Sequence, residues 1–106
     1  MASQLSLLYT TFGSKEGAIR VSRDLLEKRL IASANIVEGM HSLYLWEGRV
    51  EENKETGVFF KTTPEKISSL MTALQELHPY DIPAMLEISL NHTNEAFVKW
   101  AQTSMR

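Results

Sequence analysis

The sequence has 106 residues, no cysteine, 43% hydrophobic and 23% charged residues, and a formal net charge of -2. This balance predicts one small globular domain over residues 1–106, and it excludes disulfide bridges and thiolate metal sites. The charge gives no electrostatic reason to expect nucleic acid or an anionic membrane as a partner. The start of the chain has neither a basic stretch nor a long apolar run, so we expect no signal peptide and a cytoplasmic location.

The first elements in chain order are a short strand and an amphipathic helix. Residues 5–11 are rich in leucine and threonine, which is typical of a strand. Ser14 is placed to cap the following helix, with Glu16 in its first turn. From Ala18 onward the apolar residues recur at helical spacing, so one face of this helix should be buried.

A long hairpin is predicted next. Residues 34–46 and 50–62 are both of β type, and the tripeptide at 47–49 contains the glycine of a plausible hairpin turn. Glu38-Gly39 interrupts the first of these strands. Val58 lies in the apolar centre of the second strand.

The remaining elements are a helix, a strand and a last helix. Thr63-Pro64-Glu65 has the N-cap, first-position proline and early acid of a helix start, and Pro79 should end that helix. Residues 85–90 alternate enough to form one more strand. Thr93 or Asn94 should cap the final helix, whose inward-facing residues are Phe97, Ala101 and Met105.

The order β-α-β-β-α-β, followed by an extra helix, predicts an α+β fold of the ferredoxin-like type. In that fold one antiparallel sheet carries two helices on one face. The other face has to be covered, and the long hairpin with Tyr44 and Trp46 is more sheet than one small domain needs. Both points predict contacts between subunits.

Five segments, in the right order and spread over nearly the whole chain, resemble the CutA family of divalent-cation tolerance proteins. The segments are Leu26 to Ala32, the hairpin from Ser42 to Glu52, Lys61-Thr62, His78-Pro79-Tyr80-Asp81-Ile82-Pro83 and the late tryptophan Trp100.

This resemblance implies a homotrimer with a ferredoxin-like core, in which long strands pair across subunits. It implies an association with tolerance of divalent metals such as copper, without catalytic activity and without an obligatory cofactor. The architecture is also similar to that of the trimeric PII signalling proteins. An alternative is therefore a PII-like sensor that binds a small anion or nucleotide in a cleft between subunits, near Lys61 and His78.

The sequence departs from the family pattern at four positions. Ser33 stands where the family often has cysteine, and Ala84 stands where a glutamate is common. Glu38 and Ser89 each replace a usual proline. The first two changes put a shared metal site in doubt but leave the expected fold and trimer intact.

His78 is the candidate metal ligand, since imidazole binds copper and zinc. The alternative is that its ring caps the last carbonyls of the preceding helix. His41 and His92 form no chelating pair with it in sequence, and we expect both at the surface.

Four glutamates surround the hairpin turn, and oxygen-rich clusters can hold hard divalent cations. A solvated hairpin is the preferred interpretation, because exposed acids need no partner. The four residues are Glu47, Glu51, Glu52 and Glu55.

The residues expected in a cleft or interface are Tyr44, Trp46, Glu47, Lys61, Tyr80 and Trp100. Tyr44 and Trp46 could stack on a planar ligand, but we favour interface packing for them. Lys61, at a strand end, either attracts an anion or is a solvated edge lysine.

Enzymatic interpretations have little support. Residues 11–17 form a strand-to-helix turn with two glycines, but the spacing is not that of a P-loop. An acylphosphatase would have an arginine there, whereas this chain has Lys15. Ser33 and Ser42 lie in no recognisable nucleophile motif.

Overall fold

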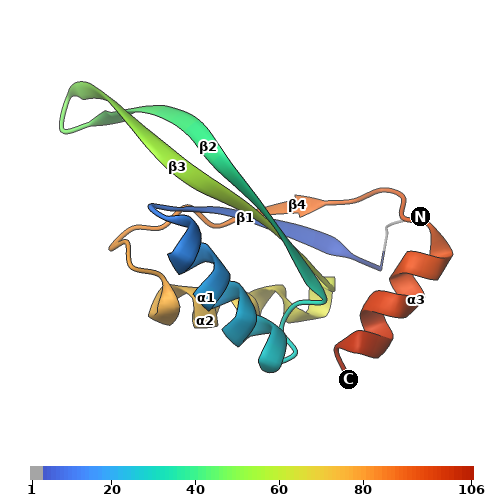
Figure 1. Ribbon diagram of the computed structural model, residues 1–106. Helices are drawn as coiled ribbons and strands as arrows, with labels where there is room; N and C mark the ends of the chain where they lie inside the picture. Colours follow the sequence, from blue (N-terminus) through green and yellow to red (C-terminus); the bar gives the residue numbers. More distant parts are fainter. Residues whose placement is uncertain (1–3) are drawn as a thin grey trace.

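Strands and helices follow one another in the predicted order (Figure 1). The computed structural model describes residues 4–106. The elements of this part are β1 (Ser6–Phe12), α1 (Lys15–Glu27), β2 (Ser33–Trp46), β3 (Arg49–Thr62), a 3-10 turn (Pro64–Lys66), α2 (Ile67–Leu77), β4 (Leu86–Ser89) and α3 (Glu95–Ser104).

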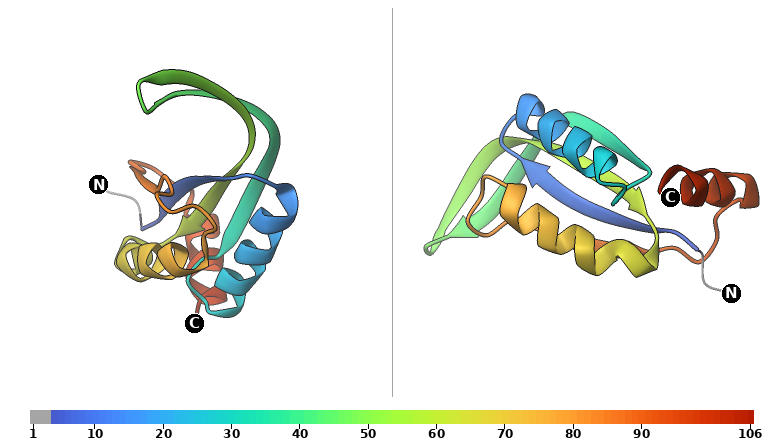
Figure 2. Two further views of the ribbon diagram at one scale, coloured as in Figure 1. Left: turned by 90° about the vertical axis from the view of Figure 1, so that its left-hand side faces the viewer. Right: turned by 90° about the horizontal axis from the view of Figure 1, so that it is seen from below.

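The sheet has the strand order β2-β3-β1-β4, and each neighbouring pair of strands is antiparallel. Helices α1 and α2 lie together on one face and leave the opposite face open (Figures 1 and 2). The predicted ferredoxin-like α+β arrangement is confirmed, with α3 as the extra carboxyl-terminal helix.

The main core lies between α1, α2 and the covered face of the sheet. Because side chains alternate along a strand, every second residue of β1 and β3 points to the helices. Burying each large apolar side chain contributes about 1.5–3 kcal/mol. The core residues are Leu8, Phe12, Ala18, Val21, Leu25, Ile31, Val58, Phe60, Ile67, Leu70 and Leu74.

The two helices of this layer begin differently. Ser14 caps α1 as predicted, with its Oγ accepting a hydrogen bond from the backbone N–H of Gly17 at 3.1 Å. The start predicted at Thr63-Pro64-Glu65 is instead a 3-10 turn, and α2 begins at Ile67. The turn is 3-10 because the N–H of Lys66 bonds to the carbonyl of Thr63, an i to i+3 contact.

The hairpin of β2 and β3 extends well past the core and curls over one side of the molecule (Figure 2). Its turn is the predicted one: Glu47 and Gly48 both have positive φ, 50° and 77°, which suits a tight hairpin. The interruption predicted at Glu38-Gly39 is a β-bulge, since the register shifts between Val37 and Met40. A bulge bends its strand and increases the local twist.

Helix α3 packs at the end of the sheet away from the hairpin turn (Figure 1). Ala101 and Met105 are buried there with Leu5 and Ala32, and Phe97 packs against this cluster. The prediction that these three residues of α3 face inward is confirmed. The Nζ of Lys66 donates to the carbonyls of Arg29 and Met105, at 2.6 and 3.0 Å, and so links the ends of α1 and α3 to the 3-10 turn.

Candidate functional site

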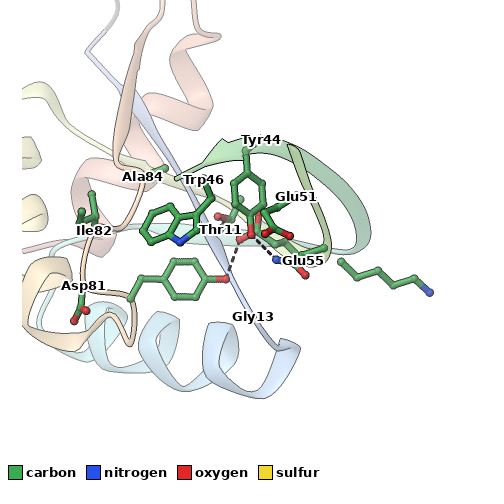
Figure 3. Close-up of a pocket in the computed structure, with 12 residues that line it drawn as sticks. Thr11, Gly13, Tyr44, Trp46, Glu51, Glu55, Asp81, Ile82 and Ala84 are labelled. Carbon is green, nitrogen blue, oxygen red and sulfur yellow. Dashed lines mark hydrogen bonds between the residues drawn. The ribbon is translucent and has the colours of Figure 1, made fainter. Parts of the chain in front are cut away.

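A cleft of about 730 Å³ lies between the curled hairpin and the segment that follows α2 (Figure 3). This volume falls in the range of small-molecule sites, roughly 300–1,000 Å³. Residues from β1, β2, β3 and the segment before β4 contribute to it. The lining residues are Thr11, Gly13, Tyr44, Trp46, Glu51, Asn53, Lys54, Glu55, Tyr80, Asp81, Ile82 and Ala84.

Glu55 is the centre of a hydrogen-bond network in the cleft. Its Oε2 accepts from the hydroxyl of Tyr80 at 2.8 Å and from the hydroxyl of Thr11 at 3.0 Å. Burial on its own would raise the pKa of this carboxyl group. Hydrogen bonds from Ser42, Tyr80 and Thr11 outweigh burial and hold the pKa below its usual value. The network therefore keeps a negative charge in the cleft at neutral pH.

Tyr80 supports this charge as a neutral donor. Burial, followed by its hydrogen bond to Glu55 and the charge of that residue, raises the pKa of Tyr80 to about 12. The phenol thus stays protonated at physiological pH and can donate to the carboxylate. Its ring also lies against the ring of His78, with centroids 4.8 Å apart.

His78 lies behind this network and is only 6% exposed. Its Nδ1 accepts from the backbone N–H of Tyr80 at 3.1 Å, so Nδ1 carries no proton. The proton of the neutral ring is then on Nε2, which donates to the carbonyl of Thr11 at 2.7 Å. The ring stacks on Phe12 with centroids 4.3 Å apart. Burial lowers the pKa of His78, in agreement with this neutral form.

The two faces of the hairpin have different chemistry. Strand pairing places Tyr44 opposite Glu51 and Ser42 opposite Asn53. Directly opposed residues project to the same face, which is the cleft face. The Nδ2 of Asn53 donates to the hydroxyl of Tyr44, which fixes that ring.

The outer face of the same hairpin is exposed and carries apolar side chains beside the charged residues Glu52 and Lys54. It carries Leu43, Leu45 and Val50, which are 66%, 75% and 72% exposed. The hairpin thus has a polar and aromatic inner side, and an outer side on which three large apolar residues are exposed.

The structure brings together about half of the residues predicted for a cleft or interface. Tyr44, Trp46 and Tyr80 line the cleft. Glu47 lies in the hairpin turn instead. Trp100 lies on α3, where its ring packs on that of Phe97 with centroids 5.4 Å apart.

Lys61 does not approach His78. Lys61 pairs with Leu7 of β1, whereas His78 bonds to Thr11. These two positions of β1 are four residues apart, about 13 Å along a strand. The Nζ of Lys61 donates to Asn35 and lies 5.9 Å from the centroid of the Phe97 ring. The predicted pair of Lys61 and His78 therefore does not form one anion site within a single chain.

Sequence reasoning missed several cleft residues, namely Thr11, Asn53, Asp81 and Ile82. Thr11 and Asn53 could have been found from strand register. Asn53 and Gly57 lie two residues either side of Glu55 on one face of β3, and Thr11 pairs with Gly57. Asp81 and Ile82 carry no such signal. They directly follow Tyr80, whose hydroxyl bonds to Glu55, and they line the cleft with it.

Metal-binding side chains do not converge in the part of the chain that the structure describes. Over residues 4–106, no three His, Asp or Glu side chains lie close enough together to hold a metal ion. Both ring nitrogens of His78 are already hydrogen-bonded. The metal role of His78 stays a prediction, and it requires the ring to release Thr11 or Tyr80. His41 lies at the surface, 3.7 Å from Glu52.

Within residues 4–106, no helix has the length and apolar character needed to cross a membrane.

Comparison with known proteins gives a consistent result over most of the chain. Residues 6–104 match the family model described as CutA1 divalent ion tolerance protein. The divalent-cation tolerance protein CutA of Pyrococcus horikoshii is 44% identical over 94 residues, which are 89% of this chain and 91% of that protein. The crystal structure of the divalent ion tolerance protein CutA1 from Ehrlichia chaffeensis superposes with a TM-score of 0.94 at 38% identity, covering 97% of this chain and 96% of the other.

One of the plant relatives is a chloroplast protein by its description. Protein CutA 1 of Oryza sativa, described as chloroplastic, is 29% identical over 100 residues, which are 94% of this chain and 56% of that protein.

Proposed function

The chain belongs to the family of CutA divalent ion tolerance proteins, and from this premise we propose that it acts in the cytoplasm as a non-enzymatic homotrimer in the tolerance of divalent metal ions, copper in particular. Its relatives are named as tolerance proteins and not as enzymes. The observation that carries the proposal is the amount of apolar surface that one subunit leaves uncovered.

The open face of the sheet supplies the first part of this surface. Val37 of β2 and Leu86 and Ile88 of β4 are 45%, 55% and 40% exposed. Tyr9 and Phe59 pack together between them, with ring centroids 5.1 Å apart. A sheet face of this kind is stable in water when another element covers it. In the proposed trimer, neighbouring subunits provide that cover.

The outer side of the hairpin supplies the second part. Leu43, Leu45 and Val50 project from an arm that extends beyond the subunit's own core (Figure 1). Such an arm can reach a neighbouring subunit. Strand β2 is also an edge of the sheet, and its unpaired backbone groups can bond to a strand of a second chain.

Light scattering on the purified protein tests the assembly directly. Three chains of 12.0 kDa each should give a mass near 36 kDa. We expect Leu45→Glu to reduce this mass, because it places a charge in the proposed contact, and we expect Leu45→Met to preserve it. A wild-type protein that remains monomeric at micromolar concentration would contradict the proposal.

Metal binding, in this proposal, is weak within one subunit. The available donors there are isolated carboxylates such as Glu51, and a fuller ligand set needs donors from a second subunit. Calorimetric titration with Cu²⁺ should therefore show tighter binding by the trimer than by the Leu45→Glu variant. If the two proteins bind copper equally, the metal role does not depend on assembly. His78→Ala should weaken copper binding if the predicted ligand role is correct.

The second candidate function is a small-ligand sensor of the PII type, and the cleft beneath the hairpin is the observation that favours it. One chain alone does not supply the predicted anion site, because Lys61 lies at the other end of β1 and Glu55 is held in its charged form. Thermal-shift screening of copper, nucleotides and organic ions separates the two candidates. A nucleotide that stabilises the protein while copper does not would favour the sensor.

A further inference from the structure

The cleft combines aromatic rings with negative charge. Tyr44, Trp46 and Tyr80 contribute rings, and Glu51 and Glu55 contribute carboxylates from one face of β3. Figure 3 shows Trp46 between Ile82 on one side and Tyr44 and the glutamates on the other. Aromatic faces attract cations through their quadrupole, and a nearby carboxylate adds to this attraction.

Positive charge is scarce in this cleft. Among the described residues, its lining contains three carboxylates, those of Glu51, Glu55 and Asp81, and one cationic residue, Lys54. Lys54 lies between Asn53 and Glu55 on β3, so strand alternation directs its side chain to the other face of the hairpin. An anionic ligand would therefore meet repulsion, whereas a cation would meet attraction.

An inorganic cation fits these residues poorly, because over residues 4–106 no three acidic or histidine side chains converge as a ligand set. An organic ammonium group needs fewer charged ligands than an inorganic cation. It needs one carboxylate as hydrogen-bond acceptor and apolar surface for its carbon body. Glu55 retains an acceptor position, since a carboxylate offers about four lone-pair sites and Thr11, Tyr80 and Ser42 occupy three.

We propose that this cleft binds a small organic primary ammonium ion, with its charged nitrogen at Glu55 and its apolar body on the ring of Trp46. Glu51 adds a second negative charge beside Tyr44. The inference rests on the second candidate function, in which the cleft is a ligand site, and replaces the predicted anion by a cation. It does not depend on copper binding.

The two tryptophans of the chain make the test direct. Trp46 lines the cleft, and Trp100 lies on α3 at the other end of the sheet (Figure 1). In a Trp100→Phe background, Trp46 becomes the only tryptophan and reports on the cleft by fluorescence. Three probes of similar shape but different charge are then titrated: 2-phenylethylamine, 2-phenylethanol and 3-phenylpropionate.

We expect 2-phenylethylamine to change the Trp46 emission in a saturable way and to bind about tenfold more tightly than the neutral alcohol. The carboxylate probe should not bind. Added salt should weaken the binding of the amine and leave the binding of the alcohol unchanged, because only the amine is held by charge. Equal binding of amine and alcohol, or preferential binding of the carboxylate, would overturn the inference.

Matched variants locate the charge. Glu55→Gln should lower the affinity for the amine about tenfold, and Glu51→Gln should lower it a few-fold. Each substitution removes one negative charge from the cleft face. Glu52→Gln is the control, since this residue lies on the same strand but pairs with Leu43 on the outer face. If Glu55→Gln proves unstable, the amine affinities of Glu51→Gln and Glu52→Gln are compared instead. Identical amine affinities in these two variants would contradict the proposed site.

Light scattering on the same samples keeps this result separate from the proposed assembly. A trimer that binds no amine would refute the ammonium site and leave the trimer standing. A monomer that binds the amine would support the ammonium site and refute the trimer.

Discussion

His78 joins three parts of the molecule, and its replacement by alanine tests how the cleft is built. The ring connects the end of α2 to the carbonyl of Thr11 in β1 and to the backbone of Tyr80, and it stacks on Phe12. Two net hydrogen bonds contribute about 1 kcal/mol each. The stacked pair adds about 0.5–1.5 kcal/mol. We therefore expect His78→Ala to lower the free energy of unfolding by about 3 kcal/mol.

Urea unfolding, followed by circular dichroism at one fixed protein concentration, measures this change. A fixed concentration is needed because the stability of an oligomer depends on it. His41→Ala is the control, since the His41 side chain is 61% exposed and its removal should change the free energy by less than about 0.5 kcal/mol. A loss below about 1 kcal/mol for His78→Ala would refute the structural role assigned to this ring.

The pH dependence gives a second measure of the same residue. Burial lowers the pKa of His78 from 6.5. As the pH falls, the His78 ring is therefore protonated in the unfolded chain at a higher pH than in the folded chain. The folded state is then favoured above pH 6.5, and this stabilisation is lost as the pH falls through the lower pKa of the folded state. The slope of stability against pH for one proton is at most about 1.4 kcal/mol per unit. This slope should be missing in His78→Ala, and an unchanged slope would show that another group causes it.

The remaining predictions concern the network, the turn and the core. In a spectrophotometric titration, one phenol should ionise near pH 12, and this ionisation step should be absent in Tyr80→Phe. If the step remains in the variant, it does not belong to Tyr80. The pKa of Glu55 is lowered from 4.5, so its share of the stability is lost as the pH falls through that lower pKa, and Glu55→Gln should flatten acid unfolding in this range. Gly48→Ala should cost about 1 kcal/mol in thermal or urea unfolding, because φ at this position is 77°. Leu70→Ala should cost about 3 kcal/mol, since the side chain is completely buried; a loss under 1 kcal/mol would mean that this core is loosely packed.

The fold could be predicted because local signals and global pattern agree. Ser14 is a helix cap in sequence and in structure, and the glycine turn at Gly48 closes the hairpin where expected. The period of the apolar residues distinguished helices from strands in the right order. The start of α2 differed, because Thr63-Pro64 is compatible with a 3-10 turn as well as with an α-helix.

The site could be predicted only in part, because it depends on contacts between residues distant in sequence. Tyr80 and Glu55 are 25 residues apart, and Thr11 and Glu55 are 44 apart. No local sequence pattern predicts a contact between residues so far apart. His78 shows the difficulty from the other direction: a conspicuous histidine suggested a metal ligand, whereas both of its nitrogens are hydrogen-bonded within the chain.

The bulge in β2 decides which side chains of the hairpin reach the cleft. Val37 lies on the open side of the sheet, and in a regular strand every second residue after it would do so, including Leu43. The extra residue at Glu38-Gly39 shifts this alternation by one. Tyr44 therefore shares the face of Glu51, and Leu43 turns to the outer side. A single inserted residue thus sets both the aromatic part of the cleft wall, which faces the carboxylates of β3, and the two leucines of the outer surface proposed for assembly. The two properties should be gained or lost together when this bulge is altered.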